Sequence, residues 1–375
     1  MFASALCANV DARAEKISEE IAFPAESDAN AFGIDILNQA IERCQRGEAD
    51  QALLLFKAIR EQLEPPANVQ QLLDAYEATG CRLTRASKGR WGLQLGFGGD
   101  SNVNQGISAS TLRLGSGDRA IDVELGEVYR PTASLFALAG IDRAFALGNW
   151  GTGQLALQSR VNQAIPALNL TSFVAGVAVP FSMLDRPGLV QMDLGATWLG
   201  SRFYQQASAA TLQWLPSRND RSWVANFATV RATYPTQRNQ DSQLFEAGVW
   251  RESVVAPGFG IFGGVSGLYD YAINHRSGGD RLGWRYQFGA SASWARWQIQ
   301  PRLSVLNWRS ENVFSPGLID VVRQHQLVAL DVQFIRPIAV NQQVVLEWKT
   351  RRADDTVPLY SFKNQTLAIY WRYQL

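Results

Sequence analysis

The stretch 282–308, LGWRYQFGASASWARWQIQPRLSVLNW, alternates apolar and polar side chains in two successive runs. Consecutive side chains of a strand point to opposite faces, so the pattern predicts two strands that are each apolar on one face and polar on the other. Ala295 and Arg296 form the predicted turn between them. The apolar face of the first run carries Trp284, Tyr286, Phe288, Ala290, Ala292 and Trp294, and its polar face carries Arg285, Gln287, Gly289, Ser291 and Ser293.

Two details of this stretch favour a membrane barrel over a soluble sheet with one face in a core. The apolar face begins and ends in tryptophan, and the strand from Trp284 to Trp294 covers about 25 Å of height once it is tilted, which matches the apolar band of an outer-membrane barrel with aromatic edges. The polar face carries Arg and Gln, whereas a soluble barrel is filled by small apolar side chains. We therefore expect transmembrane strands around a hydrated interior.

The composition agrees with a barrel and argues against several other classes. A net charge of +1 in 375 residues gives no bias towards nucleic acid. No apolar run reaches the roughly 18 residues that a transmembrane helix needs, whereas 12 Trp and 10 Tyr suit interfacial belts. Metal-ligand spacings and phosphate-binding glycine loops are not found, so we expect no metal and no cofactor.

The N-terminal part differs in character from the rest. Residues 1–30 are interpreted either as the remnant of a signal peptide, because Ala12 to Ala14 form an A-x-A sequence, or as a disordered arm. Residues 31–85 carry apolar side chains at helical spacing and resemble one and a half tetratricopeptide repeats, or else a plain helical plug or spacer. The expected helices lie within 32–47, 48–66 and 68–80.

Cys44 and Cys81 lie in this helical region, which we expect to be periplasmic. An oxidising compartment permits a disulfide between them, but the sequence leaves their geometry open, so a bonded pair and two free thiols remain equal alternatives.

Residues 86–375 are expected to form a fourteen-stranded antiparallel β-barrel. An even strand number suits a single chain whose two ends lie on one side of the membrane. The stretch 121–130 is a further candidate strand that would spoil this parity. The expected strands are 91–98, 133–146, 153–162, 170–181, 188–199, 208–215, 222–234, 242–252, 258–270, 282–294, 296–309, 325–336, 342–351 and 362–375.

The expected connections alternate in length along the barrel. Short connections follow the even strands, and longer ones tend to follow the odd strands, as periplasmic turns and external loops do in outer-membrane barrels. This alternation puts both ends of the barrel and the helical region in the periplasm. The expected long external loops are 99–132, 271–281, 310–324 and 352–361, and the expected short ones are 163–169, 200–207 and 235–241.

The side chains that should line the pore are charges of both signs and amides. Such a lining predicts a hydrated lumen with internal ion pairs and weak ion selectivity. The predicted pore-lining residues are Arg285, Gln287, Gln300, Arg302, Asp331, Glu347, Lys349 and Arg372.

The sequence contains only weak candidates for a catalytic site. His275 with Ser277, or His325 with Asp331, could be drawn as a base beside a partner, but most chains offer such pairs. We therefore expect no enzyme and assign no catalytic residue.

Two stretches resemble the surface lipoprotein assembly modifier family, the tetratricopeptide-plus-barrel outer-membrane proteins also grouped as type eleven secretion. WGLQLGFGGDSNVN (91–104) is similar to the first strand and loop of that family, with Gly99 in place of a Tyr. WLGSRFYQQ (198–206) is similar to a second family stretch, with Ser201 in place of a Gly. The matching motif residues are Asp100, Ser101, Asn102, Asn104, Trp198, Gly200, Arg202 and Tyr204. Asx and Ser side chains also cap turns, and a purely structural role for the Asp-Ser-Asn run is the favoured alternative.

The resemblance implies an outer-membrane barrel that translocates or displays a specific secreted protein or surface lipoprotein, with helices as the periplasmic contact. The implied partners are that protein cargo, outer-membrane lipid and the barrel assembly machinery, with no nucleic acid. The helical part is short for the family, which weakens cargo recognition by repeats. Two alternatives remain: an exopolysaccharide export barrel, and a passive porin or structural barrel.

Overall fold

The computed structural model describes residues 90–374 apart from 116–119, 149, 185, 217–222, 257 and 340, together with thirteen residues between Leu37 and Leu73. The chain divides into two compact units, Met1–Lys88 and Gly89–Leu375.

In the first unit every described residue is helical, and these residues fall inside the three segments where helical spacing was found. The buried ones are Leu37, Ala40, Ala52, Phe56, Ile59 and Leu73. The tetratricopeptide-like arrangement, the proposed signal remnant over residues 1–30, and Cys44 and Cys81 lie outside the described residues. No helix among the described residues is long and apolar enough to cross a membrane.

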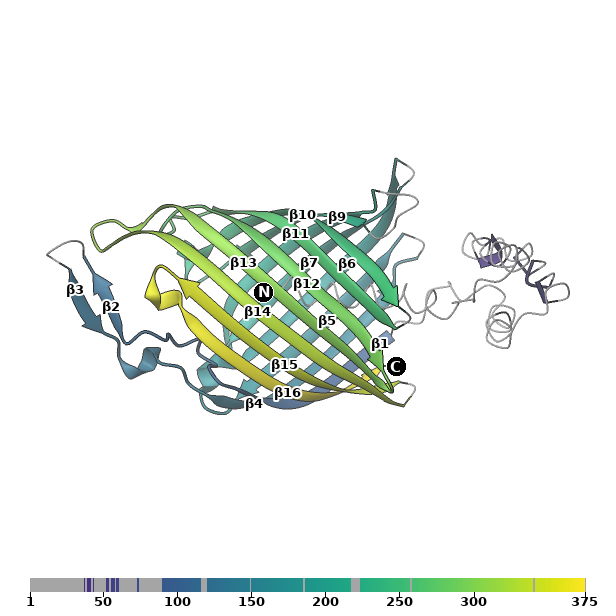
Figure 1. The fold of residues 1–375 in the computed structure, drawn as a ribbon, viewed down its shortest axis with the longest axis horizontal. Coiled ribbons are helices and arrows are strands. Elements are labelled where there is room, and N and C mark those ends of the chain that lie inside the picture. The colour runs from purple at the N-terminus through teal and green to yellow at the C-terminus, as the bar shows by residue number, and fades with distance from the viewer. Residues whose placement is uncertain are drawn as a thin grey trace. The chain divides into compact units, whose positions relative to one another are not determined.

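The second unit is a closed antiparallel barrel of fourteen strands, which confirms the expected architecture (Figure 1). The strands are β1 (Arg90–Asp100), β4 (Ser134–Ala146), β5 (Thr152–Asn162), β6 (Leu170–Met183), β7 (Arg186–Leu199), β8 (Arg202–Trp214), β9 (Trp223–Thr233), β10 (Ser242–Ala256), β11 (Phe259–Ala272), β12 (Arg281–Trp294), β13 (Trp297–Ser315), β14 (Ile319–Ala339), β15 (Gln342–Asp355) and β16 (Phe362–Gln374).

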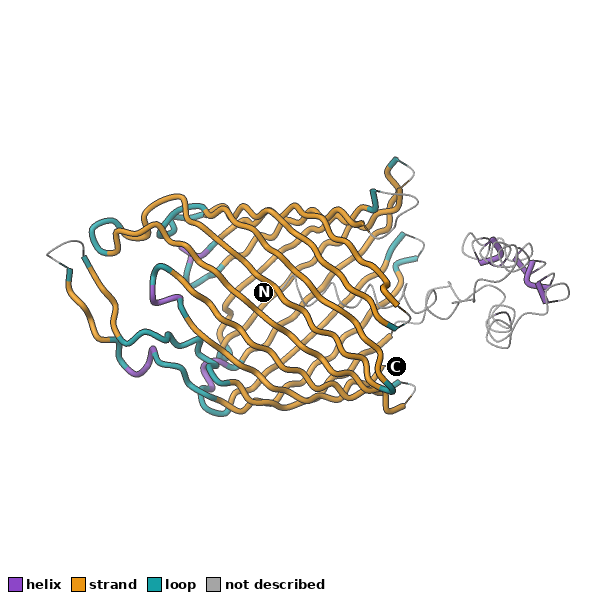
Figure 2. Tube along the Cα trace, viewed as in Figure 1, coloured by secondary structure: helices purple, strands orange, loops and turns teal. Residues whose placement is uncertain are grey.

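The barrel closes because β1 pairs on one side with β4 and on the other with β16. Gln94, for example, lies opposite Gly140 and opposite Arg372. Closure leaves no strand of the barrel with an unpaired edge, which a sheet inside a membrane requires. The strands run steeply tilted around the wall (Figure 2).

The alternation of connections divides the barrel into two ends. We call the end that carries 101–133, 163–169, 234–241, 273–280 and 356–361 the long-loop end, and the end that carries 147–151, 295–296 and 340–341 the short-turn end. The Ala295–Arg296 turn is as tight as expected, since Trp294 pairs with Trp297 and Ala295 has a φ of 53°.

The prediction of a long loop over 310–324 was wrong. β13 continues to Ser315 and β14 begins at Ile319, and Val313 pairs with Val322 beyond a register shift. Outward side chains here are polar, such as Glu311 and Gln324, so the stretch lacked the apolar alternation by which a membrane strand is recognised. A ladder of backbone hydrogen bonds holds it as a strand regardless.

The expected loop at 200–207 was also wrong, because β8 begins at Arg202. The connection is only Gly200 and Ser201, with φ angles of 54° and 67°. Both values are typical of the tight turns that join paired strands. The register shifts after Thr197, and the first residues of β8 carry polar side chains on both faces. The apolar–polar alternation that predicts a strand is therefore missing there.

The stretch 121–130 does contain a strand, but outside the barrel. β3 (Ile121–Glu124) pairs only with β2 (Thr111–Leu114), and the two form a separate hairpin within the connection 101–133. The barrel therefore keeps its even number. Figure 1 shows this hairpin projecting away from the strands at the long-loop end.

The outer face of the barrel is apolar and bounded by aromatic residues. Trp91 and Trp294 are exposed at the short-turn end, and Phe97 and Trp284 at the long-loop end. Three arginines at the short-turn end lie over outward aromatic rings: Arg143 over Trp91 at 4.9 Å, Arg251 over Trp223 at 5.3 Å and Arg336 over Trp297 at 5.5 Å. Apolar surface between aromatic girdles is the exterior of a barrel in the outer membrane.

Candidate functional site: the inner wall of the barrel

Exposure separates the two faces of strand β12. On β12, Trp284, Tyr286 and Phe288 are exposed, whereas Arg285 and Gln287 between them are half-buried. The exposed aromatic residues face outward, so the alternate residues face the lumen. Cross-strand partners share a face, and the printed registers therefore carry this assignment around the whole barrel.

All eight predicted pore-lining residues lie on the inner face. They come from five consecutive strands, β12 to β16. Arg302 on β13 lies opposite Asp331 on β14, which lies opposite Lys349 on β15. One row nearer the short-turn end, Gln300, Gln333 and Glu347 follow the same order. Arg372 on β16 lies opposite Gln94 of β1.

These side chains form a hydrogen-bonded network. Lys349 Nζ lies 2.7 Å from Glu347 Oε2 and 3.8 Å from Asp331 Oδ1. Gln333 Nε2 donates to Glu347 Oε1 at 2.8 Å. Glu347 is buried, and a buried carboxylate must be paired to be tolerated. We call this network, together with Arg285, Arg302 and Arg372, the charged wall.

Several inner contacts span two strand spacings. Arg285 on β12 reaches Glu246 on β10 at 2.6 Å, across β11. Arg160 on β5 likewise reaches Asp100 on β1 at 2.7 Å, across β4. Side chains converge on the concave side of a curved sheet and diverge on its convex side, so these contacts agree with an inward orientation.

The opposite part of the inner face is small and mostly uncharged. Strands β6 to β9 present mostly glycine, alanine, serine, threonine and valine, with the amides of Gln191, Gln205 and Gln213, where β12 to β16 present charges. The inward residues there, by register, include Gly176, Ala178, Gly195, Ala207, Ala209, Thr211, Ala228 and Ala232. The exception is Asp193 on β7, which accepts hydrogen bonds from Gln154 and Gln191, both at 2.9 Å.

Sequence reasoning missed several inner carboxylates, among them Asp100, Asp142, Asp193 and Glu246. Glu246 had a usable signal, because Phe245, Ala247 and Val249 alternate with it as an apolar outer face. The inner position of Asp142 follows from its pairing with Gly92, whose lack of a side chain leaves room for the carboxylate.

The inner face at the long-loop end carries a second group of ion pairs. The side chain of Asp355 is fully buried, and its Oδ2 lies 2.8 Å from Arg323 Nε and 2.9 Å from His325 Nδ1. The Arg323 guanidinium lies 3.5 Å from the centre of the Tyr360 ring. Arg276 donates to the Asp270 carboxylate at 2.8 Å, and this tie holds the connection 273–280.

The histidine pairs that the sequence allowed are not the ones that form. His325 contacts Asp355 instead of Asp331, because Asp355 is its direct cross-strand partner and Asp331 lies three inward positions further along β14. His275 and Ser277 are both exposed in the connection 273–280.

The Asp-Ser-Asn run at the end of β1 fastens the connection 101–133. Asn102 is 1% exposed; its Nδ2 donates to the Gly106 and Lys363 carbonyls at 2.8 and 2.9 Å. Its Oδ1 accepts the Gly106 amide at 2.6 Å. Asn104 binds the returning chain through the Arg130 carbonyl and the Thr132 amide. Ser101 Oγ accepts the amide of Gln365 on β16 at 2.8 Å.

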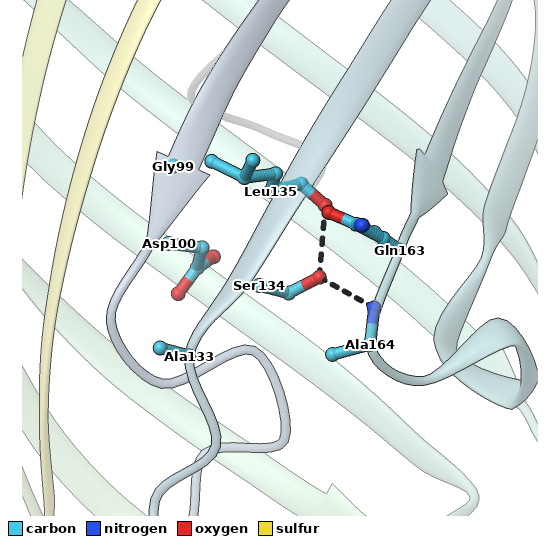
Figure 3. Close-up of a pocket in the computed structure, with 7 residues that line it drawn as sticks. All are labelled: Gly99, Asp100, Ala133, Ser134, Leu135, Gln163 and Ala164. Atoms are coloured by element: carbon cyan, nitrogen blue, oxygen red, sulfur yellow. Dashed lines mark hydrogen bonds between the residues drawn. The ribbon is translucent and has the colours of Figure 1, made fainter.

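Next to this run lies a pocket of about 550 Å³, lined by Gly99, Asp100, Ala133, Ser134, Leu135, Gln163 and Ala164 (Figure 3). Ser134 Oγ accepts the Ala164 amide at 3.0 Å and donates to the Leu135 carbonyl at 2.8 Å. Ser134 thereby joins β4 to the connection 163–169.

The second matching stretch forms the corner between β7 and β8. The rings of Trp198 and Phe203 lie 5.8 Å apart, and those of Tyr204 and Tyr234 lie 5.5 Å apart edge to face. Gly200 donates its amide to the Asn169 carbonyl at 2.8 Å, and a side chain there would collide with Ala167. Arg202 is exposed at the start of β8.

Comparison with protein-family models and with curated proteins finds no match. Solved structures of similar fold include the outer membrane protein Omp33 of Acinetobacter baumannii, at 6% identity, with 76% of this chain and 99% of that chain covered and a TM-score of 0.38. A BenF-like porin from Pseudomonas fluorescens has 10% identity, 77% and 99% coverage and a TM-score of 0.37. OmpF of Salmonella typhi in complex with daunomycin has 8% identity, 77% and 97% coverage and a TM-score of 0.38. Likeness at this level assigns no function to the residues of this chain.

Proposed function

We propose that the barrel is a passive channel for small hydrophilic solutes across the outer membrane. The observation that carries this proposal is the lining: the charged wall on β12 to β16 faces small and neutral residues on β6 to β9. Paired charges and amides favour a hydrated lumen, because each would be costly in an apolar interior. Small side chains on the facing wall leave width for a solute.

The path of the connection 101–133 supports the same proposal. Its contacts run along the rim: Ser108 donates to the Ser361 carbonyl, and Gly115 donates to the Leu318 carbonyl at 2.7 Å. Ile107, Leu112 and Leu125 form a small apolar cluster against Leu359. These partners belong to the connections of β13 to β16, the neighbours of β1 in the wall, so the loop is held along one side of the mouth.

Conductance across a planar lipid bilayer tests the proposal. The purified protein should form stable pores with weak ion selectivity, because acidic and basic side chains alternate on the lining. Lys349→Glu should shift the reversal potential towards cations, since Lys349 faces the lumen. Arg352→Glu is the matched control on the same strand: Arg352 points outward with a 60% exposed side chain and should leave selectivity unchanged. Absence of pores, or equal shifts in both variants, would refute a solute pathway along this wall.

A second proposed function is translocation or display of a secreted protein or surface lipoprotein, with the helical segment as its periplasmic contact. The observation in its favour is the set of buried helical residues, such as Phe56 and Leu73, that precedes the barrel. The matching motif residues favour it less, because the structure uses Asn102, Asn104 and Gly200 to fasten loops.

Deletion of the gene separates the two functions. Surface proteolysis with mass spectrometry would then compare exposed proteins with the wild type. Loss of one or a few specific proteins from the surface, with persistence in the periplasm, would support translocation. Slower uptake of small solutes with an unchanged surface proteome would support the channel, and an altered polysaccharide coat would support exopolysaccharide export instead.

A further inference from the structure

The outer face of the barrel has a hollow of about 1070 Å³ at the long-loop end. It extends over β11 to β15 and includes Trp284 of the aromatic girdle. Outward side chains of these strands line it, among them Tyr269, Trp284, Asn307 and Gln326. Other lining residues engage partners on the inner face, as Asp355 does with Arg323.

Two aromatic rings form one side of the hollow. Trp284 is 55% exposed, and its indole packs on the wall beside Gly267, where an added Cβ would lie 3.5 Å from the ring. Tyr269 is 43% exposed, and its hydroxyl donates to Asp280 Oδ2 at 2.6 Å. These contacts hold both rings at the boundary between apolar wall and water.

The remaining lining consists of amides and charges. Gln326 Nε2 donates to Asn307 Oδ1 at 3.0 Å, which leaves the Asn307 amide nitrogen and the Gln326 oxygen available to a ligand. Asp354 is paired with Arg352 at 2.8 Å. The remaining Asp280 and Glu311 outnumber Arg309, so the hollow is weakly acidic. Among the described residues no group of three or more acidic, His or Cys side chains is placed to hold a metal ion. The lining therefore disfavours a phosphate group, whether bound directly or through a bridging cation.

We propose that this hollow binds the sugar headgroup of a glycolipid in the surrounding outer leaflet. Flat aromatic rings stack on the C–H faces of a sugar, and amides and carboxylates bind its hydroxyl groups. The hollow lies on the lipid-facing wall, and long connections of such barrels face the cell exterior, where the leaflet is rich in glycolipid. The acidic lining selects neutral or amine-bearing sugar units over phosphates. This binding is independent of what passes through the lumen.

Native mass spectrometry of the full-length protein in detergent tests the proposal, with purified rough lipopolysaccharide and phosphatidylglycerol as separate probes. The wild type should retain the glycolipid at least tenfold more strongly than Trp284→Leu or the Asn307→Ala/Gln326→Ala double variant. Trp294→Leu is the matched control, because Trp294 is an exposed girdle tryptophan on the same strand at the opposite end. Heat-dependent gel migration verifies that each variant folds, and the double variant keeps the test valid where Trp284→Leu misfolds.

Three outcomes would overturn the proposal. The first is equal retention of phosphatidylglycerol and glycolipid. The second is release of the glycolipid by a chelator, which would assign the contact to cation-bridged phosphates. The third is full competition by free glucosamine, which would make a soluble sugar the ligand.

Discussion

Gly176 shows how one residue shapes the lumen. It faces inward on β6, and a Cβ atom there would collide with Asp193 Oδ1 and lie 2.9 Å from Gln154 Nε2. Gly176→Ala should therefore displace the carboxylate from its hydrogen-bond partners and destabilise the barrel by about 1–3 kcal/mol. Urea-dependent unfolding in detergent measures the free energy of unfolding.

Gly195→Ala is the control for that substitution. Gly195 also faces inward, on the next strand, but its nearest neighbour for a new Cβ lies at 3.7 Å, an ordinary contact. It should change the free energy of unfolding by well under the Gly176→Ala value. Equal effects of the two substitutions would show that glycine flexibility, not the Asp193 contact, sets the requirement.

Tyr234, just beyond the end of β9, contributes to the stability of the fold in a way that depends on pH. Burial, with smaller contributions from Tyr204 and Asp270, raises its pKa from 10.0 to about 12, because the charged phenolate is disfavoured there. A raised folded-state pKa means that the neutral hydroxyl stabilises the fold fully below about pH 10, and that this contribution is lost as the pH rises through about 12.

Tyrosinate absorbance during alkaline titration measures this. Tyr234 should titrate late, and Tyr234→Phe should reduce the late absorbance change by that of one tyrosine. Gln205, which donates to the Tyr234 hydroxyl at 2.7 Å, should lose its partner in this variant. An unchanged late step after Tyr234→Phe would assign it to another tyrosine.

At the scale of an element, the connection 101–133 is predicted to lie beside the mouth and not to restrict it. Replacing residues 110–125, which contain β2 and β3, by a short Gly-Ser linker should leave single-channel conductance unchanged. Asn102 and Asn104 would still fasten the two ends of the shortened loop. A large rise in conductance would show that the hairpin obstructs the pathway.

Element boundaries were predictable only where the strands face lipid. The expected strand 282–294 agrees with β12 (Arg281–Trp294) to within one residue at each end. β13 and β14 run past the lipid into water, where an outward side chain need not be apolar, and there the expected loop at 310–324 failed. The hairpin β2–β3 lies outside the barrel and has no lipid-facing side, so its boundaries could not be predicted from alternation either.

At the scale of the whole molecule, the barrel unit is expected to fold without the first unit. Its closure depends on pairing between β1 and β16, both inside residues 89–375. A fragment of residues 89–375 should therefore refold into detergent micelles with the heat-dependent gel migration of a closed barrel. A fragment of residues 89–361, which lacks β16, is the control and should fail. Failure of the longer fragment would indicate that residues 1–88 assist folding.

The face of a strand on which a side chain lies is easier to predict from sequence than the residue with which that side chain pairs. Alternation assigns Arg285 and Lys349 to the inner face, because an inward residue follows from its outward neighbours. The pairing of Arg285 with Glu246 depends instead on curvature, which brings β10 and β12 close enough for side chains to meet over β11. The alternation of side chains within single strands does not show how the barrel wall curves, so it could not predict this ion pair.

The sequence by itself determined the class of fold, the strand number and the face on which each clear strand carries its charges, because lipid imposes a period of two on every residue that it touches. Only the tertiary structure decided which charges pair, how far β13 and β14 extend, and that the connection 101–133 is held along the rim. Those features depend on register, closure and curvature, which arise between strands distant in the chain.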